Sequence, residues 1–361
     1  MRHQQFFSMQ DPIVSNCIEL LQELIATPSF SREEDATADL IAAFLTERGL
    51  VVERAGNNVW VRHPHWQQEL PVVLLNSHHD TVKPAASWQR DPFTAQWEGD
   101  QLFGLGSNDA GGPLISLIAA FLQLTNRKDL PYNLLLAATA EEEISGAGGI
   151  ASILPELGPI NCAIVGEPTS LDAATAERGL IVIDGEAAGV SGHAARDEGV
   201  NALYVALEDI DRLRQYEFPE KSELLGPVKV SVTQIESGTQ HNVVPDRCRF
   251  VMDVRVNERY SNQQVVEELQ AVCKSTLKAR SLRLQSSGLP LGHPLLKAVD
   301  ACGLSPYGSP TLSDQALMPF PTLKLGPGDS ARSHTADEYI RRTEIEAGVQ
   351  TYLAVLEQLT F

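Results

Sequence analysis

Short apolar runs that end in polar or glycine-rich segments constrain the fold of this chain more than any other feature. Three of them, at residues 72–76, 134–138 and 163–165, have the length and composition of buried β-strands. Helical patterns at 113–124 and 148–154 alternate with them. Strands that alternate with helices predict an α/β sheet that is covered by helices on both faces.

Two amphipathic helices are expected before this pattern. The second is predicted to begin at Ser31, because Glu34 three residues further on completes the sequence signature of a capping box.

The pattern changes near residue 177. From there to 287 the order is strand, helix, strand, strand, helix, strand, with the last helix expected at 262–276 and the last strand at 281–285. This is enough chain for a small core of its own. The sequence therefore predicts a discontinuous main domain, residues 1–176 and 288–361, with an α+β domain inserted at 177–287.

The composition excludes several classes of partner. The 361 residues carry a formal net charge of −19, and such a surface repels nucleic acid. No segment has the roughly 18 consecutive apolar residues of a membrane span, and residues 1–12 lack the pattern of a secretory signal. The five cysteines are scattered without CxxC spacing, which is typical of reduced thiols in a cytoplasmic protein.

The first polar segment, which follows the run at 72–76, pairs a histidine with a carboxylate. On a strand, His78 and Asp80 point to the same side because residues two apart share a face. A carboxylate behind a metal-bound imidazole fixes its tautomer, so His78 fits a ligand with Asp80 behind it. His79 points the other way and is expected to be structural. The alternative is two polar residues that end a strand at the surface.

The next two segments place carboxylates beside glycines. Asp109 lies among small residues, 104–112, just before a helix. It either caps that helix or lies where the small residues let the backbone approach a bound ion. Three consecutive glutamates, 141–143, follow the second strand. Their mutual repulsion is relieved either by a cation or by open solvent, so a solvated turn is the alternative.

Glu167 follows the third strand, and His334 lies in a loop near the C-terminus. Each is also typical of a surface residue. Taken together, the five segments carry only nitrogen and oxygen ligands, which zinc accepts, and four of them stand at strand ends, where open α/β sheets bind ligands. Two zinc ions about 3.5–4 Å apart need a shared carboxylate and further ligands on each side. The segments together indicate a metal site.

In order and spacing, these residues resemble the M20 metallopeptidases, and among them acetylornithine deacetylase and succinyl-diaminopimelate desuccinylase. The resemblance covers nearly the whole chain. The pattern that carries it is His78-x-Asp80, Gly106-x-x-Asp109, Glu142-Glu143, Gly166-Glu167-Pro168 and His334. It implies a zinc-exopeptidase-like catalytic domain, with a mixed sheet between helices, and an inserted ferredoxin-like lid domain.

The resemblance also implies how two zinc ions per chain would be held, with cobalt as a substitute metal. Asp109 would bridge the two ions, and a cis peptide bond would follow it. His78 and Glu167 would complete one ion, and Glu143 and His334 would complete the other.

For the reaction itself, the resemblance implies that Glu142 is the general base and that Asp80 orients His78. Two positions depart from the family pattern. The family has glycine where this chain has Ser77, and aspartate where it has Glu141. Neither change removes a ligand, but the second leaves open a register in which Glu141 is the base and Glu142 a ligand.

Further residues are implied to act on the substrate. His193 would reach into the site of a partner subunit and stabilise the oxyanion, so a homodimer through the lid domain is expected. Asn242 and Arg255 resemble substrate-contacting residues. The planar fork of Arg255 suits a carboxylate, and its alternative is an ordinary exposed charge. Gly326 is expected to shape the loop that carries His334 and to present backbone amides to substrate.

The expected function is therefore zinc-dependent hydrolysis of the amide bond of a small N-acyl amino acid. N-acetylornithine, in arginine biosynthesis, is the first choice of substrate, and N-acetylcitrulline and N-succinyl amino acids follow. A dipeptidase or an aminoacylase remains open within the same chemistry. A metal-free binding protein on the same fold is the alternative of a different class, and it would be expected to lack the base or one of the ligands.

Overall fold

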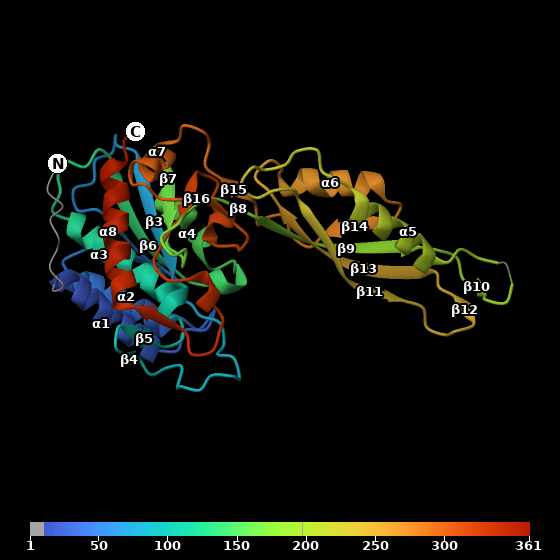
Figure 1. Cartoon of the computed structure of the whole chain (residues 1–361), viewed down its shortest axis with the longest axis horizontal. Coiled ribbons are helices and arrows are strands. Elements are labelled where there is room, and N and C mark those ends of the chain that lie inside the picture. The colour runs from blue at the N-terminus through green and yellow to red at the C-terminus, as the bar shows by residue number, and fades with distance from the viewer. Residues whose placement is uncertain (1–10, 197) are drawn as a thin grey trace. The chain divides into compact units, whose positions relative to one another are not determined.

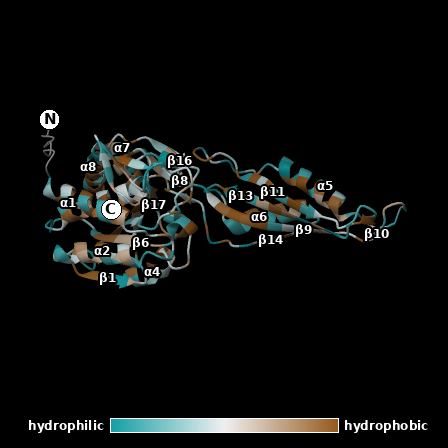
Figure 2. Cartoon of the chain, turned by 90° about the horizontal axis from the view of Figure 1, so that it is seen from below, coloured by the Kyte–Doolittle hydropathy of each residue, from teal (hydrophilic) through white to brown (hydrophobic). Residues whose placement is uncertain are grey.

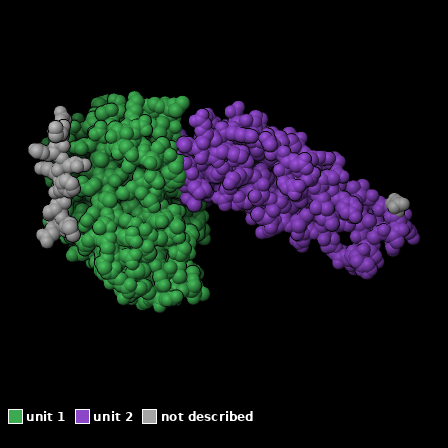
Figure 3. All heavy atoms as spheres, viewed as in Figure 1, with its two compact units in different colours: residues 1–175, 289–307, 313–361 green, residues 176–288, 308–312 purple. Residues whose placement is uncertain are grey.

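The computed structural model describes residues 11–196 and 198–361, and the chain forms two compact units (Figure 3). Unit 1 comprises residues 1–175, 289–307 and 313–361, and unit 2 comprises residues 176–288 and 308–312. The sequence predicts no secretory signal at residues 1–12, and residues 1–10 of this segment lie outside the described residues.

Unit 1 is built around a mixed sheet, as the sequence predicts (Figure 1). Its central strands β6, β3, β7 and β17 run parallel, whereas β2 and β8 pair antiparallel with the strands beside them. The strand order in unit 1 is β1-β2-β6-β3-β7-β17-β8. The strands are β1 Val52–Ala55, β2 Asn58–Arg62, β3 Val72–His78, β6 Asn133–Thr139, β7 Cys162–Val165, β8 Ala173–Glu177 and β17 Thr322–Lys324. Two short strands, β15 Ser287–Gly288 and β16 Pro306–Ser309, pair with β8, and β15 consists of residues of unit 2.

Helices cover both faces of this sheet. Every residue of β3 is buried, and successive side chains point to opposite faces. Val73 and Leu75 pack in the cluster that includes α1, α2, α3, α7 and α8, whereas Val72 and Leu74 pack in the cluster that includes α4. The helices are α1 Pro12–Ala26, α2 Asp35–Glu47, α3 Gly112–Leu124, α4 Ile150–Leu157, α7 Pro294–Ala301 and α8 Arg342–Gln358. A small separate sheet contains β4 Gln96–Glu98, β5 Gln101–Phe103 and β18 Tyr339–Arg341.

The second helix begins later than the sequence predicts, and the expected capping box is wrong. α2 begins at Asp35, and the Ser31 hydroxyl donates a hydrogen bond to Asp80 instead of capping the helix. The Glu34 carboxylate accepts from the backbone N–H groups of Arg32 and Glu141. Both residues of the predicted box therefore fix neighbouring loops.

Unit 2 has a β-α-β-β-α-β order and an antiparallel sheet with strand order β11-β13-β9-β14. If these four strands are numbered 1 to 4 in chain order, their order across the sheet, read from β14, is 4-1-3-2. This is the arrangement of ferredoxin-like folds. α5 buries residues 202, 206, 209 and 213 on one face and leaves its other face toward solvent. Hydrophilic and hydrophobic residues therefore alternate along the helix (Figure 2). The elements are β9 Gly179–Ala188, β10 Gly192–His193, α5 Ala202–Gln215, β11 Lys229–Ser237, β12 Val243–Val244, β13 Arg247–Val256, α6 Asn262–Val272 and β14 Thr276–Ala279.

The end of α6 differs from the prediction of a helix over 262–276. The helix ends at Val272, and the buried Asp209 carboxylate accepts hydrogen bonds from the backbone N–H groups of Lys274 and Ser275. A carboxylate far away in the sequence therefore captures the amides that would have continued the helix.

The last strand of unit 2 is also misplaced in the prediction. β14 occupies Thr276–Ala279, and residues 281–285 are not a strand. The side-chain amide of Asn262 donates to the backbone carbonyls of Leu282 and Leu284. The Leu284 carbonyl also accepts from the Leu180 N–H of β9, so residues 281–285 keep one backbone contact with the sheet without forming a strand.

Within the described part of the chain, no helix is long and apolar enough to cross a membrane.

Leu75 provides a test of the packing in unit 1. It is fully buried in β3, which is paired on both sides. Replacing Leu75 with alanine should lower the free energy of unfolding by about 2–5 kcal/mol, because it removes buried methyl groups and leaves a cavity. All four tryptophans lie in unit 1, so their fluorescence during urea unfolding reports on this unit.

Val51→Ala is the matched control, because Val51 is 81% exposed. It should change the free energy of unfolding by no more than about 0.5 kcal/mol. Equal unfolding midpoints for the two variants would contradict the packing described here.

Candidate metal centre

The polar segments that follow three neighbouring strands meet at one edge of the unit 1 sheet. β6, β3 and β7 are adjacent and parallel, so their carboxyl ends lie at the same edge. β3 ends in His78, β6 is followed by the glutamates 141–143, and β7 is followed by Glu167. Asp109 and His334 join them from two loops.

His78, Asp109 and Glu167 form the first group of potential metal ligands. One ligand atom from each lies within 4.8 Å of the others. His78 Nε2 is 3.3 Å from Asp109 Oδ1 and 3.8 Å from Glu167 Oε1. The His78 side chain is only 1% exposed, so this group lies in the interior of the unit.

Asp109, Glu143 and His334 form the second group, with the same spread of ligand atoms. His334 Nε2 is 2.9 Å from Glu143 Oε2 and 3.6 Å from Asp109 Oδ2. Asp109 thus presents Oδ1 to the first group and Oδ2 to the second. A carboxylate that is shared in this way is what a pair of cations needs. The peptide bond after Asp109 is cis, as the family resemblance implies.

Asp80 fixes the orientation of His78 and the position of the glutamate turn. His78 Nδ1 lies 3.0 Å from the Asp80 backbone oxygen, which can only accept, so Nδ1 carries a proton and Nε2 is the nitrogen that faces the other ligands. The Asp80 side chain accepts from the backbone N–H groups of Glu142 (3.0 Å) and Glu143 (3.2 Å). His79 points away and contacts the Thr37 hydroxyl, as expected of a structural residue.

Among the three glutamates, Glu141 turns away from the cluster. Its backbone is left-handed, with φ of 54°, and its side chain accepts from the Gly148 N–H and lies 3.8 Å from Arg32 Nε. Glu142 Oε2 lies 3.7 Å from His78 Nε2 instead. The geometry therefore places Glu142, and not Glu141, beside the first group.

The cluster concentrates negative charge in a buried place. Burial raises the pKa of Glu142 well above its usual value and outweighs the opposite effect of His78, and the nearby negative charge of Glu167 adds to this rise. Burial and the Asp109 charge likewise raise the pKa of Glu167 to about 8. A divalent cation would relieve this repulsion, and the oxygen and nitrogen ligands present are those that zinc accepts.

Comparison with known proteins identifies the family of the chain. A sequence model of the Peptidase family M20/M25/M40 matches residues 74–358. The chain belongs to this family. It is therefore a metal-dependent amidohydrolase, and the resemblance seen in the sequence is confirmed.

Two curated relatives are similar to this chain over nearly all of its length. A succinyl-diaminopimelate desuccinylase of Stenotrophomonas maltophilia (strain R551-3) is 27% identical over 96% of this chain and 100% of its own length. A protein of Pyrobaculum aerophilum that is named as a LysW-lysine and LysW-ornithine hydrolase is 26% identical over 94% of this chain and 97% of its own.

Solved structures show the same fold at lower identity. The aminopeptidase PepT of Bacillus cereus has a TM-score of 0.74 at 17% identity and covers 96% of this chain and 98% of that one. The YxeP protein of Bacillus subtilis, described as a dinuclear metal-binding peptidase of the M20 family, has a TM-score of 0.72 at 17% identity with the same coverage.

Two buried carboxylates beside the M20 centre were not predicted from the sequence. Glu338 accepts hydrogen bonds from three backbone N–H groups of the Asp109 loop. Asp314 accepts from the Thr139 hydroxyl at the end of β6 (2.7 Å), and burial raises its pKa to about 6. Glu338 stands four residues after His334, which was its only signal in the sequence, and Asp314 begins a short 3-10 helix, Asp314–Leu317, with no pattern around it.

The loop that carries His334 is held from both ends. Arg332 forms a bidentate ion pair with Glu344 at the start of α8, at 2.8 and 2.7 Å. At the start of this loop, shortly after β17, Gly326 lies against the backbone of Glu167, where a Cβ would come within 2.5 Å of the Glu167 oxygen. His334 itself remains 55% exposed, so the second group of ligands is open to solvent on one side.

The other predicted substrate residues lie in unit 2. His193 ends β10 and Asn242 precedes β12, and the two strands pair, so these residues are neighbours. Both are exposed. Arg255 forms a bidentate ion pair with Asp253 on its own strand, at 2.8 and 3.0 Å. Its fork is thus occupied by a carboxylate of the protein, as an ordinary charge on a strand face would be.

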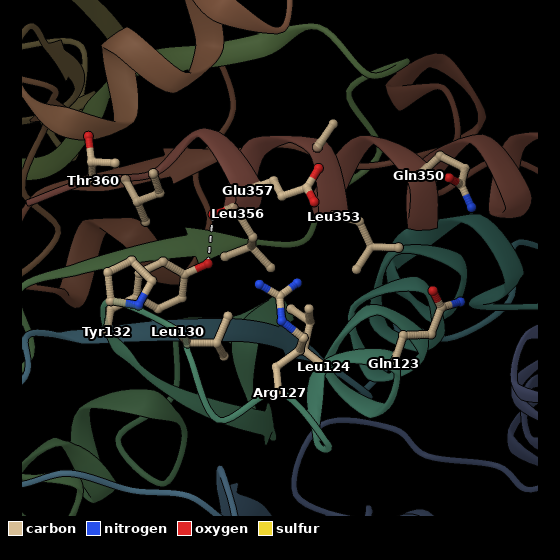
Figure 4. Close-up of a pocket in the computed structure, with 13 residues that line it drawn as sticks. Gln123, Leu124, Arg127, Leu130, Tyr132, Gln350, Leu353, Leu356, Glu357 and Thr360 are labelled. Carbon is tan, nitrogen blue, oxygen red and sulfur yellow. Dashed lines mark hydrogen bonds between the residues drawn. The ribbon is translucent and has the colours of Figure 1, made fainter. Parts of the chain in front are cut away.

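A separate hollow in unit 1 lies between α3 and α8 (Figure 4). Arg127, Tyr132, Gln350 and Glu357 are among its lining residues, and the Tyr132 hydroxyl donates to the Leu356 backbone oxygen. No candidate metal ligand lines it, so this hollow is separate from the metal centre.

The placement of the glutamates predicts different effects of two neighbouring substitutions. Glu142→Gln should lower the rate of amide hydrolysis by about 10²–10⁴-fold, because it removes the group that can accept a proton. It should leave metal content unchanged, since Glu142 belongs to neither ligand group. Glu141→Gln is the control and should keep both rate and metal content. Turnover and metal content are measured for both variants. Ordinary turnover by metal-loaded Glu142→Gln contradicts the placement of Glu142 beside the first ligand group.

Proposed function

We propose that this M20 enzyme holds two zinc ions and removes the acyl group from the amino group of a small diamino acid. The observation that carries the proposal is the sharing of Asp109 by two ligand groups, with the proton-accepting Glu142 beside the first. All five ligand residues and the base are present in the chain. A metal-free binding protein on the same fold would have no need of them.

The residues divide the work of amide hydrolysis. Zinc bound at His78, Asp109, Glu167, Glu143 and His334 would lower the pKa of a water molecule and polarise the amide carbonyl. Glu142 takes the proton of the attacking water. Its raised pKa suits a group that then returns that proton to the departing amine.

The substrate is proposed from what the relatives have in common. Both relatives are named for a derivative of a diamino acid, diaminopimelate in one case and lysine or ornithine in the other. N-acetylornithine, the first choice from the sequence, is likewise a derivative of a diamino acid. The diamino acid is therefore the shared part, and the acyl group, acetyl or succinyl, is what experiment must assign.

A substrate panel tests this proposal. Zinc-reconstituted enzyme should hydrolyse N-succinyl-diaminopimelate, N-acetylornithine or both with a kcat/KM at least about tenfold above that for N-acetylcitrulline, N-acetylmethionine and a dipeptide. A tenfold ratio of kcat/KM corresponds to a difference of about 1.4 kcal/mol in activation free energy, which the loss of one buried contact with the substrate can supply. Release of acetate, succinate or free amino acid is followed by chromatography. Preference for the dipeptide contradicts the deacylase, and a zinc-loaded chain that hydrolyses nothing supports a binding protein.

We further propose a homodimer that forms through unit 2. β11 is an edge strand of its sheet, and exposed apolar side chains lie beside that edge. Tyr204 and Leu207 on α5 are 65% and 49% exposed, and Ile235 on β11 is 49% exposed. A sheet edge flanked by apolar side chains suits a symmetric contact between copies. In such a dimer the exposed His193 would act on the substrate bound by the partner chain.

The dimer predicts a change of mass on substitution. Leu207→Asp should produce a monomer, because it buries a charge in the contact. Val51→Asp, at an exposed apolar position of unit 1, should remain a dimer. Sedimentation equilibrium measures both, and an active monomer of the unmodified chain contradicts the dimer and the role of His193.

A further inference from the structure

Glu338 holds the loop of the bridging carboxylate in place. Its side chain is buried, and the residue is 2% exposed. Glu338 Oε1 accepts from the backbone N–H groups of Asn108 and Asp109, both at 2.8 Å, and Oε2 accepts from that of Gly106 at 3.1 Å. Three hydrogen bonds from backbone N–H groups to this one side chain restrain the loop at the residue that would bridge two metal ions.

Glu338 also belongs to the segment that carries His334. The Glu338 backbone oxygen accepts from the Gly104 N–H at 3.0 Å, and β18, which follows directly, pairs with β5. The segment 334–341 is therefore fastened to the start and to the middle of the Asp109 loop. Asp109 and His334 reach the second ligand group from two loops that are joined at Glu338.

The first group depends less on this junction. His78 ends the buried strand β3, and Glu167 directly follows the buried strand β7, so the sheet places both. Only Asp109 connects the first group to Glu338. In the second group, Asp109 and His334 both depend on it, and His334 is more than half exposed and has little packing of its own.

We propose that Glu338 is a positioning residue that sets the affinity of the second metal, the one bound by Asp109, Glu143 and His334. Glu338 binds no metal itself and acts by fixing two of the three ligands relative to each other. The inference rests on the proposed metal pair. It states that a change at Glu338 weakens zinc binding at the second site more than at the first.

The experiment is a zinc titration of the full-length, metal-stripped chain against a chromophoric chelator. The unmodified chain should bind two zinc ions. Glu338→Ala should weaken the second ion by about 10–100-fold, the usual cost of losing a residue that orients metal ligands, and should change the first by less than about threefold. Cobalt titration, followed by its absorption spectrum, should show the loss of the second set of bands.

Glu338→Gln gives an intermediate case. An amide of the same size keeps one accepting oxygen, but its NH₂ group must face one of the three N–H donors. The second ion should then bind more weakly than in the unmodified chain and more tightly than in Glu338→Ala. If Glu338→Ala does not fold, Glu338→Gln carries the test.

Asp209→Asn is the matched control. Asp209 is also a fully buried carboxylate, and it accepts from the backbone N–H groups of Lys274 and Ser275, but it belongs to unit 2. This variant should lower the melting temperature while both zinc affinities stay unchanged. The comparison separates a general loss of stability from a specific loss of metal binding.

The possible outcomes distinguish this inference from the proposed function. An unmodified chain that binds fewer than two zinc ions overturns the metal pair itself. Two ions bound by the unmodified chain and equally well by both Glu338 variants overturn only the role of Glu338. Equal weakening of both ions, or the same weakening in Asp209→Asn, also overturns it, because the effect would then not be directed at the second site.

Discussion

Buried carboxylates that accept backbone N–H groups hold the loops of the metal centre in place. Glu34 accepts from the N–H of Glu141, and Asp80 accepts from the next two, those of Glu142 and Glu143. Glu338 does the same for the Asp109 loop. Each of these carboxylates would be costly to bury without such partners. The hydrogen bonds that satisfy them also fix where the functional side chains point.

This arrangement places further carboxylates against each other at the carboxyl ends of the central strands. Burial and mutual repulsion raise the pKa values of Glu142, Glu143 and Glu167, whereas the hydrogen bond and charge of His78 outweigh burial and lower that of Asp109. A metal-free cluster of this kind is electrostatically strained. Divalent cations would relieve the strain, and Asp109, with one oxygen toward each ligand group, connects the two positions.

The sequence was sufficient for those parts of the structure that local patterns determine. The apolar strands, the inserted β-α-β-β-α-β segment and the polar residues at strand ends all follow from side-chain periodicity and turn chemistry. The choice of Glu142 over Glu141 did not, because it depends on the left-handed backbone of Glu141 and on contacts with Asp80 and Glu34.

The failures share a physical cause. The predicted capping box at Ser31 is absent because Asp80, 49 residues away, takes its hydroxyl hydrogen bond. α6 ends early because Asp209 captures two of its amides from another helix. Glu338 holds amides more than two hundred residues distant in the chain. Long-range hydrogen bonds of buried carboxylates leave no local pattern, so a single sequence does not reveal them.

The most direct test of this account is diffraction from crystals of the zinc-loaded protein, with anomalous differences measured at the zinc absorption edge. The account predicts two peaks about 3.5–4 Å apart, one beside His78 and Glu167 and the other beside Glu143 and His334, with Asp109 between them. A single peak, or zinc bound away from Asp109, would contradict it.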